Sequence, residues 1–101
     1  MDIKNGMRPV HPGETLSEEI EAAGVSAGVL STALDVPLSR VTQILEGRQG
    51  ITADTALRLA RYFGTSPQIW LSLQQTWELR RAETEVGRQI TKRVTPRQSA
   101  A

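Results

Sequence analysis

Apolar residues recur every three or four positions along most of this chain, and no stretch alternates apolar with polar residues for more than a few positions. The first spacing is typical of a helix with one buried face, and alternation is typical of a strand. The pattern therefore predicts an all-α protein. Prolines and small polar residues at helix starts, and glycines at helix ends, divide the periodic stretches into five segments.

These signals place the five helices over residues 12–23, 26–34, 37–46, 52–63 and 66–85. Each stretch carries an apolar stripe at helical spacing, which would bury one face of the helix against a shared core. The side chains expected to face that core are Leu16, Ile20, Val29, Leu30, Ala33, Leu34, Val41, Ile44, Leu45, Ala56, Leu57, Ala60, Phe63, Ile69, Trp70, Leu73 and Trp77.

The chain is expected to form one domain with two short flanks, because its 101 residues fit a single core. Residues 1–7 form an N-terminal arm, residues 8–86 the helical domain, and residues 87–101 a basic stretch that is poor in apolar side chains. Such a stretch cannot bury enough apolar surface to stay folded, so we expect a flexible tail. Contact between this tail and DNA phosphates is the alternative.

Residues 27–47 have the pattern of a helix-turn-helix. Two short predicted helices are joined by a turn of three or four residues, and a small residue, Ser31, stands where they would cross. The inward positions with this spacing are Leu30, Ser31, Leu34, Val36, Val41 and Ile44. The motif favours DNA binding, although an ordinary helical hairpin with a solvated face would share its pattern.

The outward face of the second helix in this motif offers side chains that can read bases. Glutamine can bond adenine twice, arginine can do so with guanine, and serine and threonine bond base edges or phosphates. The residues predicted to read bases are Leu38, Ser39, Arg40, Thr42 and Gln43. Phosphate contacts are expected from Arg48 and at the helix starts near Ser26 and Pro37, because helix N-termini attract anions.

The amino-acid composition excludes several classes of function. The chain has no cysteine and a single histidine, His11. Zinc fingers, thiol catalysis and multi-histidine metal sites are therefore excluded, and no cofactor is expected. No catalytic constellation surrounds His11 in the sequence, so a role in capping or bracing the helix beside Pro12 is favoured and an enzyme is not expected. No apolar run could span a membrane and no signal peptide is visible, so we expect a cytoplasmic protein without a membrane partner.

The charges are unevenly distributed although the net charge is only +1. Acidic residues outnumber basic ones in the first 36 positions, and basic residues dominate the rest. This asymmetry suggests two different partners, or one partner and one solvated face. Glu14, Glu18 and Glu21 share one face of the first predicted helix. That face is either solvated or meets a basic protein surface.

The sequence resembles the HigA-type antitoxins, within the wider Xre/Cro-like helix-turn-helix group. The resemblance rests on RPVHPGE at 8–14, on the helix-turn-helix with PLSRV at 37–41, and on the long block 50–67 with WLSLQ at 70–74. It implies a five-helix lambda-repressor-like fold, a homodimer and binding to a palindromic double-stranded operator. It also implies neutralisation of a HigB toxin similar to RelE-type ribosome-dependent mRNA nucleases.

Three positions depart from the pattern of the wider group. Ala27 stands where a glutamine often grips a phosphate, which puts that phosphate contact in doubt. Ser31 replaces the usual alanine at the helix crossing, and Asp35 replaces the usual glycine of the turn. Aspartate tolerates the left-handed backbone conformation, so the fold should persist.

The resemblance also suggests partners for two other surfaces. Glu14, Glu18 and Glu21 are the candidate toxin-binding residues, because an RNase that binds phosphates presents a basic surface. The last predicted helix has a second apolar edge, which suggests pairing with a second copy of the chain. The residues expected at that dimer interface are Trp70, Leu71, Trp77 and Leu79, and the two tryptophans fit a place in the core as well.

The predicted function is that of an antitoxin in a type II toxin–antitoxin module. Such a protein represses its own operon and neutralises a HigB-like toxin. A stand-alone Xre-family transcriptional regulator without a toxin partner is the alternative, because it would share the helix-turn-helix. A toxin-binding module that has lost DNA binding is a third possibility.

Overall fold

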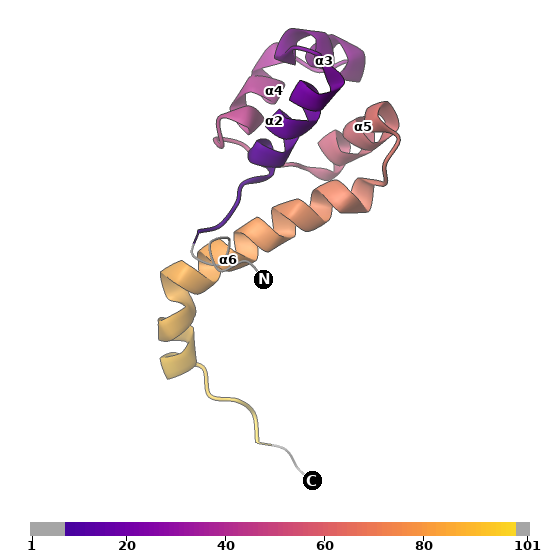
Figure 1. Ribbon diagram of the computed structural model, residues 1–101. Coiled ribbons are helices and arrows are strands. Elements are labelled where there is room, and N and C mark those ends of the chain that lie inside the picture. The colour runs from indigo at the N-terminus through magenta and orange to yellow at the C-terminus, as the bar shows by residue number, and fades with distance from the viewer. Residues whose placement is uncertain (1–7, 99–101) are drawn as a thin grey trace.

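The computed structural model describes residues 8–98, which fold into five helices and contain no strand (Figure 1). The helices are α2 (Pro12–Ala23), α3 (Ala27–Leu34), α4 (Leu38–Leu45), α5 (Ala53–Phe63) and α6 (Pro67–Arg93). The prediction of an all-α fold is confirmed. The predicted N-terminal arm, residues 1–7, lies outside the described residues.

Local signals in the sequence set the helix boundaries. The Ser26 hydroxyl accepts the backbone N–H of Val29 at 3.1 Å, and the Thr52 side chain caps α5 in the same way. Gly24 and Gly64 end α2 and α5 with φ angles of 72° and 73°. Only glycine reaches this left-handed region without steric cost, so these two positions stop their helices as predicted.

The core lies where α2, α3, α4, α5 and the first half of α6 meet. Its buried members are Leu16, Leu30, Leu34, Val41, Ile44, Ile51, Ala56, Leu59 and Trp70. Val29, Leu57 and Ile69 were expected to face this core, but they are 53%, 61% and 51% exposed. The apolar stripe of each helix is wider than its contact with its neighbours, so the outer edge of the stripe stays in solvent.

Helix α6 is longer than predicted. Its first half packs against α5 and α2, and its second half projects beyond the rest of the fold (Figure 1). The expected end near Glu85 was wrong, because the helix continues to Arg93 and residues 87–93 of the predicted tail are helical. An ion pair between Arg81 and Glu85 at 2.8 Å and two basic residues in the last turn favour this extension. Residues 94–98 have no regular secondary structure.

His11 connects the start of α2 to α6. Its Nδ1 atom accepts the backbone N–H of Gly13 at 2.8 Å, and the Glu14 carboxylate accepts the His11 backbone N–H at 3.4 Å. The imidazole meets the Trp77 ring edge-on, with 4.6 Å between the ring centroids. The predicted capping and bracing role is confirmed. Burial lowers the pKa of His11, and Arg81 lowers it further while Glu14 opposes the shift.

Gln74 ties the loop after α4 to α6. Its Oε1 atom accepts the backbone N–H of Ile51 at 2.7 Å, and its Nε2 atom donates to Glu78 at 2.9 Å. Gly50 lies so close that a Cβ atom there would come within 2.6 Å of the Gln74 amide. This buried hydrogen bond holds the segment that follows the helix-turn-helix, and helical periodicity alone did not predict it.

Candidate nucleic-acid interface

Helices α3 and α4 and the turn between them form the predicted helix-turn-helix. Asp35 ends α3 with φ 59°, and Val36 N–H donates to the Ser31 carbonyl at 3.0 Å. The buried Ser31 hydroxyl donates to the Gly28 carbonyl at 2.8 Å. Ser31 is therefore small enough for the helix crossing, and its hydroxyl has a hydrogen-bond partner there. Asp35 adopts the left-handed turn conformation in place of glycine.

Helix α4 buries Val41 and Ile44 and turns its other face outward. Leu38, Ser39 and Gln43, three of the predicted base-reading residues, are exposed on that face. The fourth, Thr42, is half-buried, and its hydroxyl donates to the Ser39 carbonyl at 3.2 Å. This hydroxyl can still accept a hydrogen bond from a base.

Arg40, the fifth predicted base-reading residue, is held by α5. Its Nη1 atom lies 2.6 Å from Oδ2 of Asp54, and the same oxygen accepts from Nε of Arg58 at 2.9 Å. Nη1 of Arg58 donates to the carbonyls of Leu34 and Asp35 at 2.8 and 3.2 Å. This network joins α5 to both helices of the motif, and it was not predicted from the sequence. The Asp54–Arg58 spacing of four residues was its one local signal.

The charge of Asp54 is maintained by the two arginines. The hydrogen bond from Arg58, and then that from Arg40, lowers the pKa of Asp54 below its ordinary value. The carboxylate therefore stays ionised at neutral pH.

The predicted phosphate-binding residues differ in their availability. Arg48 is well placed in solvent, with 76% of its side chain exposed and a carboxylate oxygen of Glu46 at 3.5 Å. Ser26 already accepts a backbone N–H with its hydroxyl, and Ala27, the first residue of α3, is half-buried. Helix α4 begins after Pro37 without a side-chain cap. The Arg40 N–H donates to the Pro37 carbonyl at 3.0 Å, so the N–H groups of Leu38 and Ser39 are the ones available to a phosphate.

The predicted toxin-binding glutamates are also unequal. Glu14 forms an ion pair with Arg8 at 2.8 Å and completes the cap of α2, and Arg8 lowers the pKa of Glu14. Glu18 and Glu21 are exposed on the same helix. Only these two therefore offer carboxylates that the fold does not already use.

The predicted dimer residues do not form one surface. Trp70 is 2% exposed and its indole N–H donates to Thr65 at 3.3 Å, so it belongs to the core of the single chain. Trp77 is half-buried between His11 and Arg81, whose guanidinium carbon lies 4.9 Å from the Trp77 ring. The assignment of Trp70 to the interface is corrected, because the core covers it, whereas Trp77 keeps exposed surface and stays a prediction. Leu71 packs against the core, and Leu79 is 62% exposed.

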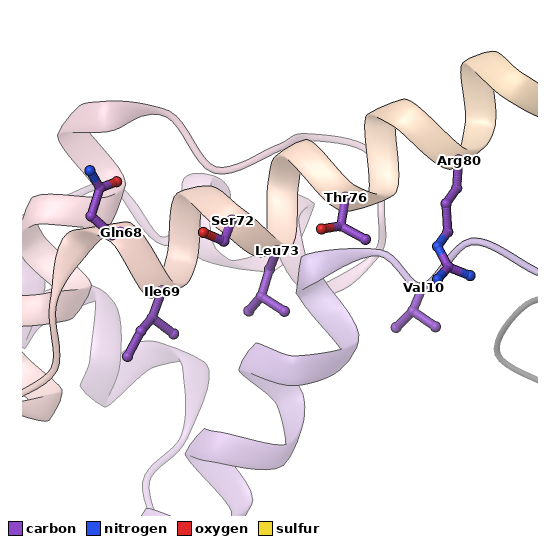
Figure 2. A pocket seen from close by; sticks show the side chains of 7 residues that line it. All are labelled: Val10, Gln68, Ile69, Ser72, Leu73, Thr76 and Arg80. Carbon is purple, nitrogen blue, oxygen red and sulfur yellow. The ribbon is translucent and has the colours of Figure 1, made fainter. Parts of the chain in front are cut away.

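The outer face of α6 carries an apolar groove that the prediction did not define. Val10 closes it on one side, and Ile69 and Leu73 give it an apolar floor (Figure 2). The other residues that line it are Gln68, Ser72, Thr76 and Arg80. Ile69 was predicted inward, and its spacing with Leu73 was the signal that could have indicated this groove.

Comparison with known proteins places the chain in the helix-turn-helix class. A family model described as a helix-turn-helix domain matches residues 13–68. Virulence-associated protein I of Dichelobacter nodosus is 49% identical over 83 residues, which are 81% of this chain and 77% of that protein. Antitoxin HigA-1 of Vibrio cholerae is 34% identical over 77 residues, covering 75% of this chain and 72% of the relative.

Solved structures narrow the class to one family. The structure of a HigA-family addiction module antidote from Coxiella burnetii is 49% identical with a TM-score of 0.86, covering 89% of this chain and 99% of that one. The Pseudomonas aeruginosa antitoxin HigA, solved with the higBA promoter, is 40% identical with a TM-score of 0.87, covering 90% and 100%. The chain belongs to the HigA-type antitoxin family. This family consists of helix-turn-helix regulators rather than enzymes.

The part of the chain that the structure describes offers neither a membrane span nor a cluster of metal ligands. None of the helices in residues 8–98 is both long and apolar enough to cross a membrane. Within the same residues, no group of three or more histidine, aspartate or glutamate side chains could hold a metal ion.

Proposed function

We propose that this protein is the antitoxin of a type II toxin–antitoxin module. It binds operator DNA in its own promoter as a repressor, and it neutralises a HigB/RelE-like mRNA-cleaving toxin in the cytoplasm. The observation that carries the proposal is the complete helix-turn-helix with an outward polar face on α4, in a chain that resembles an antitoxin solved with its promoter.

DNA recognition follows from the chemistry of α4. The helix enters the major groove, where Ser39, Arg40, Thr42 and Gln43 meet base edges and Leu38 contacts a thymine methyl group. Phosphates are contacted by Arg48, by the first turn of α3 near Ser26 and Ala27, and by the first turn of α4 at Pro37. The base contacts supply specificity, and the phosphate contacts position the protein on the duplex.

Pairing of two copies gives the protein its second recognition helix. The groove lined by Val10, Ile69 and Leu73 is an apolar surface along one side of α6, next to the core against which Leu73 packs, and the exposed Leu79 extends it along the helix. A second copy covers this surface in a homodimer, because apolar surface gains most from burial against its like. Leu71, which packs against the core, does not line this groove.

The toxin contacts the acidic face of α2. An RNase attracts phosphates with positive charge, and Glu18 and Glu21 present free carboxylates of opposite sign. We expect the E18Q/E21Q double variant to bind the toxin more weakly at low salt, with the difference shrinking as salt screens the charges. Glu14 contributes less, because Arg8 and the cap of α2 already engage it. Unchanged affinity of the double variant at low salt would exclude this surface.

A cell-based assay tests both halves of the proposed function. The promoter of the protein's own operon drives a reporter, and the small protein encoded beside it is expressed from an inducible plasmid. Wild-type protein should silence the reporter and restore growth after toxin induction. The R40A/Q43A variant should lose repression but keep rescue, because it changes only the DNA-facing helix. A neighbour that is not toxic, or that is toxic but not rescued, would favour a stand-alone regulator.

A further inference from the structure

Arg40 is the one charged side chain on α4, and a residue outside the helix-turn-helix holds it. Asp54 stands in the first turn of α5 and accepts hydrogen bonds from Arg40 at 2.6 Å and from Arg58 at 2.9 Å. The Arg40 side chain is 32% exposed, so it lies against the protein rather than extending freely into solvent. Its position is therefore set by α5 before any DNA arrives.

Arg58 fixes Asp54 in turn. The Arg58 guanidinium spans from the Asp54 carboxylate to the carbonyls of Leu34 and Asp35, at the end of α3. These carbonyls belong to the turn that orients α4. Through Arg58, the position of the Asp54 carboxylate therefore depends on the position of the turn between α3 and α4.

We propose that Asp54 is a positioning residue for DNA recognition, which orients the Arg40 guanidinium for a bidentate contact with a guanine. This inference rests on the DNA-binding part of the proposed function. The guanidinium has five N–H donors, and Asp54 engages Nη1, so donors remain for O6 and N7 of the base. Fixing a long side chain in advance removes rotamer entropy that binding would otherwise lose.

Asp54 has a second effect through its charge. A carboxylate beside Arg40 and Arg58 reduces the positive charge that this edge of the protein presents to any phosphate. Sequence-independent attraction depends on such charges and weakens as they are neutralised. Asp54 therefore increases the ratio of operator affinity to random-DNA affinity in two ways. It positions Arg40 for the operator, and it weakens the attraction to random DNA.

The test measures binding of labelled promoter DNA and of a scrambled duplex at several salt concentrations. We expect D54N to lower the ratio of the two affinities about tenfold, because a freed Arg40 discriminates bases less well. We also expect a steeper dependence of log K on log salt, by about one unit in slope. E19Q is the matched control, because it removes the same charge from an exposed position on α2 and should leave the ratio unchanged. D54E keeps the charge and should recover part of the ratio.

A double-variant cycle assigns the effect to Arg40. In an R40A background, D54N should lower the ratio no further, because the side chain that it positions is absent. The proposal is overturned if D54N keeps the wild-type ratio. It is also overturned if both D54N and R58M still lower the ratio in the R40A background. The two residues would then act by holding the turn between α3 and α4, and not by positioning Arg40. A wild-type protein without preference for the promoter would instead overturn DNA recognition itself.

Discussion

Single residues at the junction of α2 and α6 make the stability of this protein sensitive to acid. The His11 cap requires an unprotonated Nδ1, because that atom accepts the N–H of Gly13. Burial lowers the pKa of His11 below its ordinary value of 6.5 in the folded protein. The unfolded chain therefore takes up a proton first as the pH falls. Folding free energy gained from the neutral ring is present above pH 6.5 and is lost as the pH falls through 6.5 toward the folded pKa.

We therefore expect the wild-type protein to lose more stability between about pH 7.5 and pH 5 than an H11N variant. Asparagine is also a good N-cap but does not titrate in this range. Urea unfolding at several pH values, followed by circular dichroism, measures the difference. Parallel stability curves for the two proteins would show that His11 does not carry the pH dependence.

Loss of the buried side-chain amide of Gln74 should also lower the free energy of unfolding. In a Q74L variant the N–H of Ile51 would lose its acceptor in a buried site, which costs about 1–3 kcal/mol of unfolding free energy. Q75L is the matched control, because Gln75 is the exposed neighbour on the same helix. Equal midpoints for Q74L and wild type in urea unfolding would contradict the assigned role.

At the scale of the element, the two halves of the DNA interface should fail in different ways. Q43A removes a base-reading side chain from α4, so it should cost about 1–3 kcal/mol on the operator and relax specificity at one position. R48A removes a phosphate contact, so it should weaken binding to all sequences alike and reduce the salt slope by about one. Competition with single-base operator variants distinguishes these patterns, and identical behaviour of the two variants would refute the division.

How far the sequence predicted each element depended on whether its signal was local. Capping residues and stop glycines act within one turn, so the limits of α2, α3 and α5 followed from Ser26, Gly24 and Gly64. The end of α6 was missed because exposed helical turns leave no buried stripe to detect, and because the helix passes through Gly87, two residues after Glu85, without a positive φ angle.

The same distinction applies to the candidate site. The exposed polar face of α4 followed from helical spacing alone. Three hydrogen bonds join residues that only the fold brings together. They link Arg40 to Asp54, Arg58 to Leu34 at the end of α3, and Ile51 to Gln74. Helical periodicity carries no information on such pairs. It also could not show that Trp70 serves the core rather than a partner.

At the scale of the whole molecule, the projecting α6 and its apolar groove predict a homodimer at micromolar concentration. An I69R/L79R variant places charge on the outer face of α6, so it should be monomeric and bind its operator much more weakly. Two recognition helices must reach major grooves about 34 Å apart, and a monomer supplies only one. Multi-angle light scattering measures the mass.

The control for this prediction is L57R, which places a single arginine on α5 instead. Leu57 is 61% exposed and lies away from the groove on α6. This variant should remain dimeric. A monomeric wild-type protein, or a dimeric I69R/L79R variant, would contradict the assignment of this surface.

Fluorescence anisotropy can establish whether α4 reads the promoter of the protein's own operon. Labelled promoter DNA and a scrambled duplex are titrated with the wild-type protein and the R40A/Q43A variant at two salt concentrations. We expect the wild-type protein to prefer the promoter and the variant to bind both duplexes equally and weakly. Wild-type binding that does not distinguish the promoter from the scrambled duplex would contradict this expectation.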